Sequence, residues 1–238
     1  MDTNMPPVKP FPDHPDPKEY LHLSEWEKML NGFPYRPFHS SFQEPRLRCR
    51  ELVQKYNRTS YNDEKTRRSI LDDLFHPSCK ANKSMYIEPN FRCDYGANIK
   101  VGDYFYANFD CVILDCALVE FGSNCMLAPG VHVYAATHPL NAAYRQLTDM
   151  PNYYELAAPV KIGNNCWLGG GCIINPGVTL GNNVIVGAGA VVTKSFPDNV
   201  VIGGNPAKII RHMPEPSPDS EPFWKNMDGI SGNLMDLE

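Results

Sequence analysis

The chain has 238 residues, of which 42% are hydrophobic and 21% charged, and its formal net charge is −5. This composition is typical of a folded globular protein with one substantial core. A negative net charge argues against a nucleic-acid-binding protein, and no apolar run approaches the ~18 residues of a membrane-spanning helix. We therefore expect neither a nucleic-acid nor a membrane partner. The polar, proline-rich N-terminus lacks the apolar core of a secretory signal, which predicts a cytoplasmic protein.

Proline and helix signals divide the first third of the chain. Residues 1–20 contain six prolines, so we expect a disordered extension. Residues 21–80 are predicted to form a small helical subdomain. Its first helix has a capping box at Ser24 and Glu27 and a stop at Gly32.

Two further helices complete the predicted subdomain. Apolar residues recur at helical spacing over residues 47–56, which indicates a second amphipathic helix. Asn62 is predicted to cap a third helix that runs to Phe75.

Residues 81–212 carry a different pattern, a period of six. An aliphatic residue recurs at Ile162, Leu168, Ile174, Leu180, Val186 and Val192. A second small or apolar set stands four residues after each: Cys166, Cys172, Val178, Val184, Ala190 and Phe196. This period is neither helical nor the alternation of an ordinary strand. It predicts a mainly β fold, a parallel β-helix of hexapeptide repeats in which three hexapeptides make one triangular coil. Glycine and asparagine after the first set suit the corners.

The earlier coils are predicted to be less regular. Val101, Ala107 and Ile113 are six apart, and so are Phe121, Leu127 and Val133, but the two sets are offset by two residues. We expect an irregular corner near residues 115–118. Four of the eight cysteines fall on inward positions of the repeat, which predicts reduced core thiols: Cys111, Cys125, Cys166 and Cys172.

The period breaks between residues 134 and 159, and a loop of that length in a regular coil indicates function. His138 lies in this loop, and histidine is the side chain best suited to general base catalysis near neutral pH. After the coils, Ile209–Arg211 is expected to form a short closing element, and residues 213–238 to form a flexible tail.

Five short runs make the sequence resemble the maltose and galactoside O-acetyltransferases of the hexapeptide acyltransferase family. They are Asn108-Phe109-Asp110-Cys111, Ala128-Pro129-Gly130-Val131-His132, Ala136-Thr137-His138-Pro139, Asn175-Pro176-Gly177-Val178 and Gly203-Gly204-Asn205-Pro206-Ala207. The resemblance covers roughly residues 24–212 and implies a left-handed β-helix. It also implies direct transfer of acetyl from acetyl-CoA to a sugar hydroxyl, without a metal, and a homotrimer with active sites between subunits.

The resemblance also implies roles for single residues. His138 matches the family's general base, and the backbone N–H of Gly170 matches its oxyanion donor. The positions that match contacts to CoA are Trp167, Gly170, Ala188, Thr193, Lys194, Lys208 and Arg211.

The acceptor side departs from the family pattern. Asn108 matches a sugar-contacting asparagine, and Asp94 stands where the galactoside enzymes have serine. The family's two acidic acceptor contacts fall near Pro37 and at Cys116, where this chain has no acid. Two other carboxylates, Asp115, which is next to Cys116, and Glu155, could orient His138 or touch the acceptor.

Three other functions remain open from the sequence. An acetyltransferase of this kind could use a non-sugar acceptor such as serine or an antibiotic. A gamma-type carbonic anhydrase is suggested by His132 and His138, six residues apart, although the next histidine is His212. A scaffold without catalytic activity is the third, and it predicts no affinity for CoA.

Overall fold

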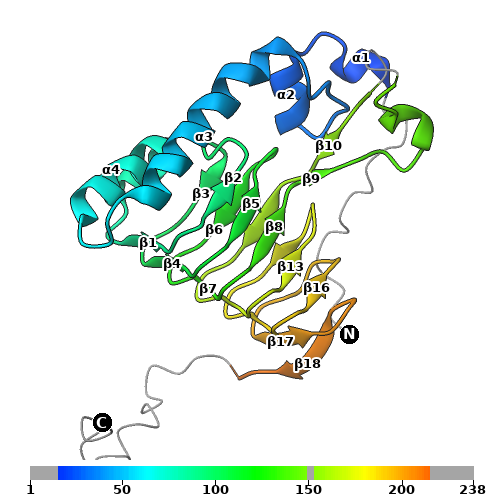
Figure 1. Cartoon of the computed structure of the whole chain (residues 1–238). Helices are drawn as coiled ribbons and strands as arrows, with labels where there is room; N and C mark the ends of the chain where they lie inside the picture. The colour runs from blue at the N-terminus through cyan, green and yellow to red at the C-terminus, as the bar shows by residue number, and fades with distance from the viewer. Residues whose placement is uncertain (1–15, 149–152, 215–238) are drawn as a thin grey trace, which may run out of the picture.

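The computed structural model describes residues 16–148 and 153–214, where a helical region is followed by a stack of parallel β-coils (Figure 1). The predictions for residues 1–15 and 215–238 lie outside the described residues. Within the described part, no helix is long and apolar enough to cross a membrane.

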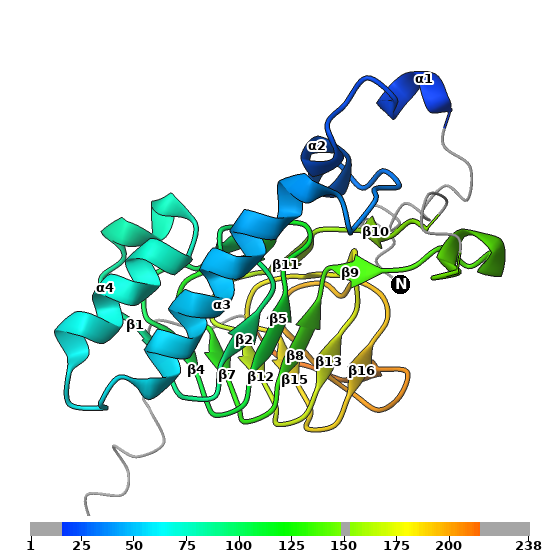
Figure 2. The same cartoon turned by 45° about the horizontal axis from the view of Figure 1, so that its top comes forward.

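The helical region lies across the first coil, with α3 next to β2 (Figures 1 and 2). Its elements are α1 (Pro17–Tyr20), α2 (Glu25–Leu30), the 3-10 turn η1 (Ser40–Phe42), α3 (Gln43–Arg58), α4 (Glu64–Leu74) and the 3-10 turn η2 (Pro77–Ala81). The capping box predicted for the first helix is present, because Ser24 and Glu27 bond each other's backbone N–H groups.

Two details of the helical region differ from the sequence predictions. Residues 17–20 form a helix, although we expected no regular structure there; Pro17 is its first residue, where a missing N–H costs nothing. The N-cap of α4 is Asp63 rather than Asn62, since the Asp63 carboxylate accepts the N–H of Thr66 at 3.1 Å.

The coils have three flat faces, each a parallel sheet. Face 1 consists of β1 (Met85–Ile87), β4 (Phe105–Ala107), β7 (Met126–Leu127), β12 (Trp167–Leu168), β15 (Ile185–Val186), β17 (Val200–Gly203) and the antiparallel closing strand β18 (Lys208–His212). Face 2 consists of β2 (Arg92–Cys93), β5 (Val112–Leu114), β8 (His132–Tyr134), β13 (Ile173–Ile174) and β16 (Val191–Val192). Face 3 consists of β3 (Ile99–Lys100), β6 (Val119–Phe121), β11 (Val160–Ile162) and β14 (Thr179–Leu180).

Strand pairing confirms the repeat and its irregularities. Ile162 pairs with Leu180, a step of 18 residues that equals three hexapeptides. In the early coils Ile99 pairs with Val119, a step of 20, which agrees with the two-residue offset predicted near residues 115–118. Phe196 pairs with Leu180, a step of only 16. Phe196 therefore belongs to the first inward set and not, as its spacing predicts, to the second, because the last coil is two residues shorter.

Inward side chains from successive coils stack into one dry core. The four cysteines predicted to face inward are fully buried, and the eight cysteines are all free thiols. Face 1 illustrates the stacking, since Leu127, Leu168, Val186 and Ile202 follow one another in register. Burial of such aliphatic side chains stabilises each coil by roughly 1.5–3 kcal/mol per side chain.

Asparagines build the corner between face 3 and face 1. Asn124, Asn165, Asn183 and Asn199 have φ values of 56–58°, a left-handed conformation that asparagine tolerates better than most residues. The side-chain amides of the first three each donate to the next asparagine, over distances of 3.1, 3.0 and 2.8 Å. These asparagines, which are not the residues predicted for the corners, thus join the coils as well as turning them.

The break in the period is a hairpin that leaves the stack between β8 and β11. Its strands β9 (Ala136–Thr137) and β10 (Leu156–Ala157) pair antiparallel, and η3 (Ala142–Arg145) lies beyond them. Figure 2 shows this hairpin projecting beside α2, away from the coils. Below, the hairpin means residues 135–148 and 153–159.

Candidate active site

The candidate residues other than Lys208 and Arg211, which lie on β18, gather at or beside the two edges of face 2. Corner 1–2 joins face 1 to face 2, and corner 2–3 joins face 2 to face 3. At or beside corner 1–2 lie Asn108, Trp167, Gly170 and Ala188. At corner 2–3 lie Asp94, Asp115, Thr193 and Lys194, together with the hairpin that carries His138 and Glu155. One chain therefore does not bring the two groups together.

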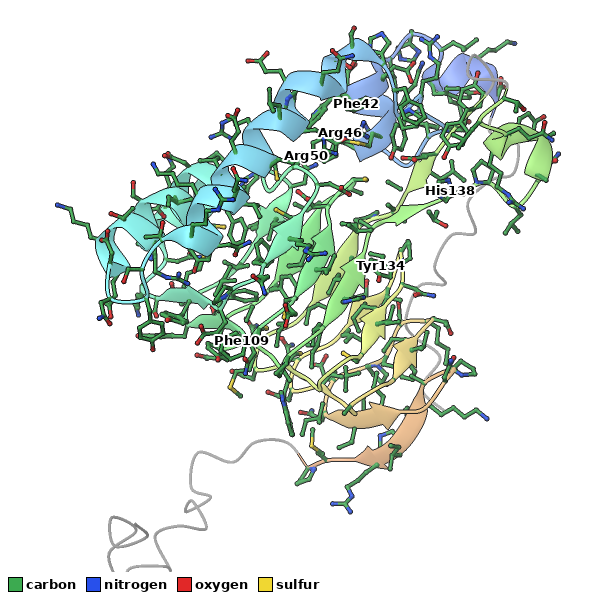
Figure 3. All side chains as sticks on the ribbon, viewed as in Figure 1. Phe42, Arg46, Arg50, Phe109, Tyr134 and His138 are labelled. Atoms are coloured by element: carbon green, nitrogen blue, oxygen red, sulfur yellow. The ribbon has the colours of Figure 1, made fainter. Side chains whose placement is uncertain are left out.

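Figure 3 makes this separation visible. His138 and Tyr134 lie on one side of the coils, whereas Phe109, the neighbour of Asn108, lies well away from them. A coil side of about six extended residues spans up to roughly 20 Å. Contact between His138 and Asn108 therefore cannot come from small side-chain movements within one chain.

His138 follows β9 directly and is exposed. Its ring packs near the ring of Tyr153 at a centroid distance of 6.3 Å. Tyr153 in turn is buried and lies 5.6 Å from the ring of Phe38. The imidazole of His138 thus lies next to the Tyr153 ring on one side and is open to a substrate on the other.

Glu155 lies across the hairpin from His138 and is tied to the helical region. Leu156 pairs with Thr137, so one further step in the same register places Glu155 opposite His138. The hydroxyl of buried Tyr35 donates to the Glu155 carboxylate at 2.8 Å. The two residues also exchange both backbone hydrogen bonds, at 3.1 and 3.0 Å.

Asp94 and Cys116 form the part of corner 2–3 nearest to Tyr35. The Cys116 thiol donates its proton to Asp94 Oδ2 at 3.4 Å, and Tyr35, whose hydroxyl donates to Glu155, lies beside Cys116. Burial raises the pKa of Asp94, while the positive charges of Arg46 and Arg50 on α3 oppose that rise. Asp94, Cys116, Tyr35 and Glu155 therefore form one polar chain from the coil to the hairpin.

Asp115 does not fit the acceptor or orienting role suggested for it. Its side chain is 0% exposed, and its carboxylate accepts the backbone N–H groups of Asp94, Tyr95 and Asn98 at 3.0, 2.9 and 3.2 Å. Burial raises its pKa to about 7, although these amides act in the opposite direction. Asp115 is a structural group beneath the turn, inaccessible to a substrate.

Corner 1–2 presents exposed backbone and an aromatic ring. Among the described residues, no acceptor meets the N–H of half-buried Gly170, whose carbonyl accepts the N–H of Gly189 at 2.9 Å. The indole of Trp167 is 48% exposed on face 1, and Ala188 is exposed one coil further. At the start of the corner, the side-chain oxygen of Asn108 accepts the backbone N–H of Phe109 at 2.8 Å.

The cations that match CoA contacts are exposed at the end of the stack. Lys208 and Arg211 lie on β18, and Lys194 lies over the ring of Phe196 at 5.6 Å. None of the three forms an ion pair within the described residues. These groups suit a ligand with several negative charges. An exposed lysine, a free backbone N–H and an open glycine corner are thus consistent with a phosphate-bearing thioester.

Sequence reasoning missed Tyr35 and Arg46. Tyr35 lies in a turn without periodicity, and only its backbone bridge to Glu155, 120 residues away, brings it to the site. Arg46 stacks over the rings of Phe42 and Tyr95 at 5.4 and 5.5 Å. Figure 3 shows Arg46 and Arg50 on α3, to the left of Tyr134 and His138. Neither the period nor the helical spacing contains a signal for these contacts.

The described residues do not gather three His, Cys, Asp or Glu side chains in a group that could hold a metal. The two histidines behind the carbonic anhydrase alternative are also in different settings. His132 lies on face 2 with Nδ1 2.6 Å from the hydroxyl of Tyr134, whereas His138 lies on the hairpin.

Comparison with known proteins gives a consistent result. The family model for the maltose acetyltransferase hexapeptide capping motif matches residues 28–78, and the six-repeat bacterial transferase hexapeptide model matches residues 159–194. The galactoside O-acetyltransferase of Escherichia coli is 34% identical over 81% of this chain and 91% of its own. A maltose O-acetyltransferase structure from Clostridium difficile is 42% identical, with a TM-score of 0.75 over 81% of this chain and 99% of that one. A galactoside acetyltransferase in complex with coenzyme A is 32% identical, with a TM-score of 0.71 over 81% and 92%.

Proposed function

This chain belongs to the hexapeptide-repeat family of maltose and galactoside O-acetyltransferases, and we propose that it acetylates a hydroxyl group of a sugar with His138 as general base. The family membership rests on relatives at least 30% identical that the chain covers almost completely. The enzyme is accordingly an acetyl-CoA-dependent O-acetyltransferase. The observation that carries the proposed mechanism is the placement of His138, exposed on a hairpin that interrupts an otherwise regular coil.

The reaction needs two proton transfers, one from the sugar hydroxyl to His138 and one from His138 to the CoA sulfur. A sugar hydroxyl is a weak nucleophile at neutral pH, so a base must take its proton while the oxygen attacks the thioester carbonyl. His138 takes that proton, the new carbon–oxygen bond forms, and the carbon–sulfur bond breaks. The imidazolium then returns the proton to the CoA sulfur. Because the sugar oxygen itself attacks the thioester, no acetylated enzyme forms.

Acetyl-CoA fits the groups at corner 1–2 and at the end of the stack. The free N–H of Gly170 can meet the negative charge that develops on the thioester oxygen. Ala188 and the ring of Trp167 offer an exposed path for the rest of the molecule beside corner 1–2, whereas exposed Thr193 lies across face 2, at corner 2–3 of the last coil. Lys194, Lys208 and Arg211 supply charges for its phosphates. Lys208 can make only point-charge contacts, unlike the forked guanidinium of Arg211.

The separation of the two groups of residues supports a site shared between copies of the chain. The base, Glu155 and Asp94 lie at corner 2–3, while Asn108 and the Gly170 amide lie at corner 1–2. Cyclic assembly about a three-fold axis would repeatedly bring corner 1–2 of one subunit to corner 2–3 of the next. A homotrimer with active sites between subunits satisfies this requirement. The sugar would then contact Asn108 of one copy and Asp94 of the other.

A panel of acceptors tests the proposed reaction. Purified enzyme is incubated with acetyl-CoA and maltose, glucose, a galactoside, serine or an aminoglycoside, while free CoA thiol and the acetylated product are measured. We expect thiol release and an O-acetylated product with at least one sugar. Turnover confined to serine or the aminoglycoside would refute the sugar assignment but retain acetyl transfer.

A further inference from the structure

The hydrogen bond between Tyr35 and Glu155 joins the helical region to the hairpin that carries the base. Tyr35 is 0% exposed and packs edge-on against Phe42 at 5.7 Å, so its ring is fixed by the helical region. Its hydroxyl donates to Glu155 at 2.8 Å, and its backbone N–H and C=O both hydrogen-bond the backbone of Glu155. This arrangement leaves the Glu155 side chain little freedom to turn away.

Glu155 also lies where it can act on His138. The antiparallel register of β9 and β10, extended by one residue, places the two directly opposite. Opposed residues in an antiparallel pair direct their side chains to the same face. Tyr153, two residues before Glu155, hydrogen-bonds the same carboxylate and packs near the His138 ring.

The titratable groups around Glu155 come from three elements. Tyr35 approaches from the helical region, Tyr153 from the hairpin itself, and Cys116, with Asp94 behind it, from corner 2–3. Burial, with the nearby Cys116 and Glu155, raises the pKa of Tyr35 far above its ordinary range. The Tyr35 hydroxyl therefore stays protonated and can only donate to Glu155 at the pH values where such an enzyme works.

We propose that Tyr35 is a positioning residue that holds the Glu155 carboxylate opposite His138, where the carboxylate orients the base and stabilises its protonated form. This inference rests on the proposed role of His138. It also assigns Glu155 to orientation of the base, one of the two roles open from the sequence. Cys116, which donates to Asp94 and lies beside Tyr35, brings the acceptor side close to this contact.

The test is a double-mutant cycle with Tyr35→Phe and Glu155→Gln in the full-length enzyme. Phenylalanine keeps the ring and the backbone bridge and removes only the hydroxyl. We expect Tyr35→Phe to lower kcat about tenfold, the size expected for loss of one hydrogen bond to a charged group, with KM for acetyl-CoA unchanged. In both variants the acid limb of kcat/KM should move to lower pH, because the protonated base loses its partner. The double variant should be no slower than Glu155→Gln alone.

A matched control separates positioning from stability. Tyr56→Phe removes a similarly buried hydroxyl of the helical region, which donates to the carbonyl of Ile87 at 2.6 Å, far along the chain from the hairpin. It should lower the melting temperature without moving the pH profile. Wild-type kcat and pH profile in Tyr35→Phe, or losses that add in the double variant, would overturn the inference. His138→Ala in the same series tells the two failures apart, since full activity there refutes the base, whereas its loss beside an unchanged Tyr35→Phe refutes only the positioning role.

Discussion

Asp115 Oδ1 accepts the backbone N–H of Asp94 at 3.0 Å, which links two consecutive coils at corner 2–3. The same carboxylate accepts the amides of Tyr95 and Asn98, so it fixes the whole turn from beneath. That turn presents Asp94 toward Cys116 and the helical region. The position of the proposed acceptor residue thus depends on a buried carboxylate that no substrate reaches.

Asp115→Asn should destabilise the protein. The asparagine oxygen can still accept the amides of Asp94 and Tyr95, but its NH₂ group faces the N–H of Asn98, and one donor loses its partner. We expect a loss of about 1–3 kcal/mol in the free energy of unfolding, measured by denaturant titration. Asp103→Asn is the control, because that half-buried carboxylate accepts the N–H of Lys83 at 3.0 Å at a distant corner. Equal losses in the two variants would contradict the special role of Asp115.

The pKa of Asp115 also predicts a pH dependence of stability. Burial raises the pKa of this carboxyl from 3.8 to about 7, so the folded state binds its proton more tightly than the unfolded state. The associated stabilisation is complete below pH 4 and is lost as the pH rises toward 7. Between pH 5 and pH 8 wild type should lose about 2 kcal/mol that Asp115→Asn does not lose. Parallel stability curves for the two proteins would show that Asp115 is already ionised at pH 5.

Removal of the terminal cations should weaken binding of acetyl-CoA without slowing chemistry. Lys208→Ala and Arg211→Ala each remove an exposed positive charge from β18. We expect KM for acetyl-CoA to rise about tenfold in each, with kcat nearly unchanged, because phosphate contacts far from the thioester contribute binding alone. Lys161→Ala removes an exposed cation from face 3 and should leave both constants unchanged. A similar rise of KM in that control would indicate a non-specific charge effect.

Co-expression of two inactive variants tests whether the site is shared. Asn108→Ala removes a group at corner 1–2, and His138→Ala removes the base at corner 2–3. With equal expression and random assembly, about a quarter of all interfaces would combine the two intact corners, one in each mixed trimer, so activity should return well above that of either variant. Activity no higher than the average of the two separate variants would place the whole site in one chain.

The sequence predicted the coils well because their cause is local. Inward residues such as Ile162 and Leu180 must repeat every 18 positions for their strands to stack, and corner residues such as Asn165 must tolerate a left-handed backbone. The same rule located the extra residues near Asp115. It misplaced Phe196, because the last coil is shorter and no repeat after Phe196 shows that the spacing has changed.

The site was less predictable because it depends on contacts between distant segments. The loop and His138 stand out as a break in the period, but Tyr35 reaches Glu155 only through the fold. The sequence predicts that Asp115 contacts the acceptor or orients His138, since sequence spacing gives no measure of its burial under three amides. The cap of α4 moved from Asn62 to Asp63 because both residue types cap helices equally well.

The most direct test of the proposed chemistry is the turnover of His138→Ala with a sugar that the wild-type enzyme acetylates. Release of CoA thiol is followed at saturating acetyl-CoA, and binding of CoA to the same variant is measured by calorimetry. We expect kcat to fall by roughly 10²–10⁴ while the affinity for CoA stays at the wild-type value, because only the base is lost. Near-wild-type turnover in His138→Ala would contradict general base catalysis by this residue.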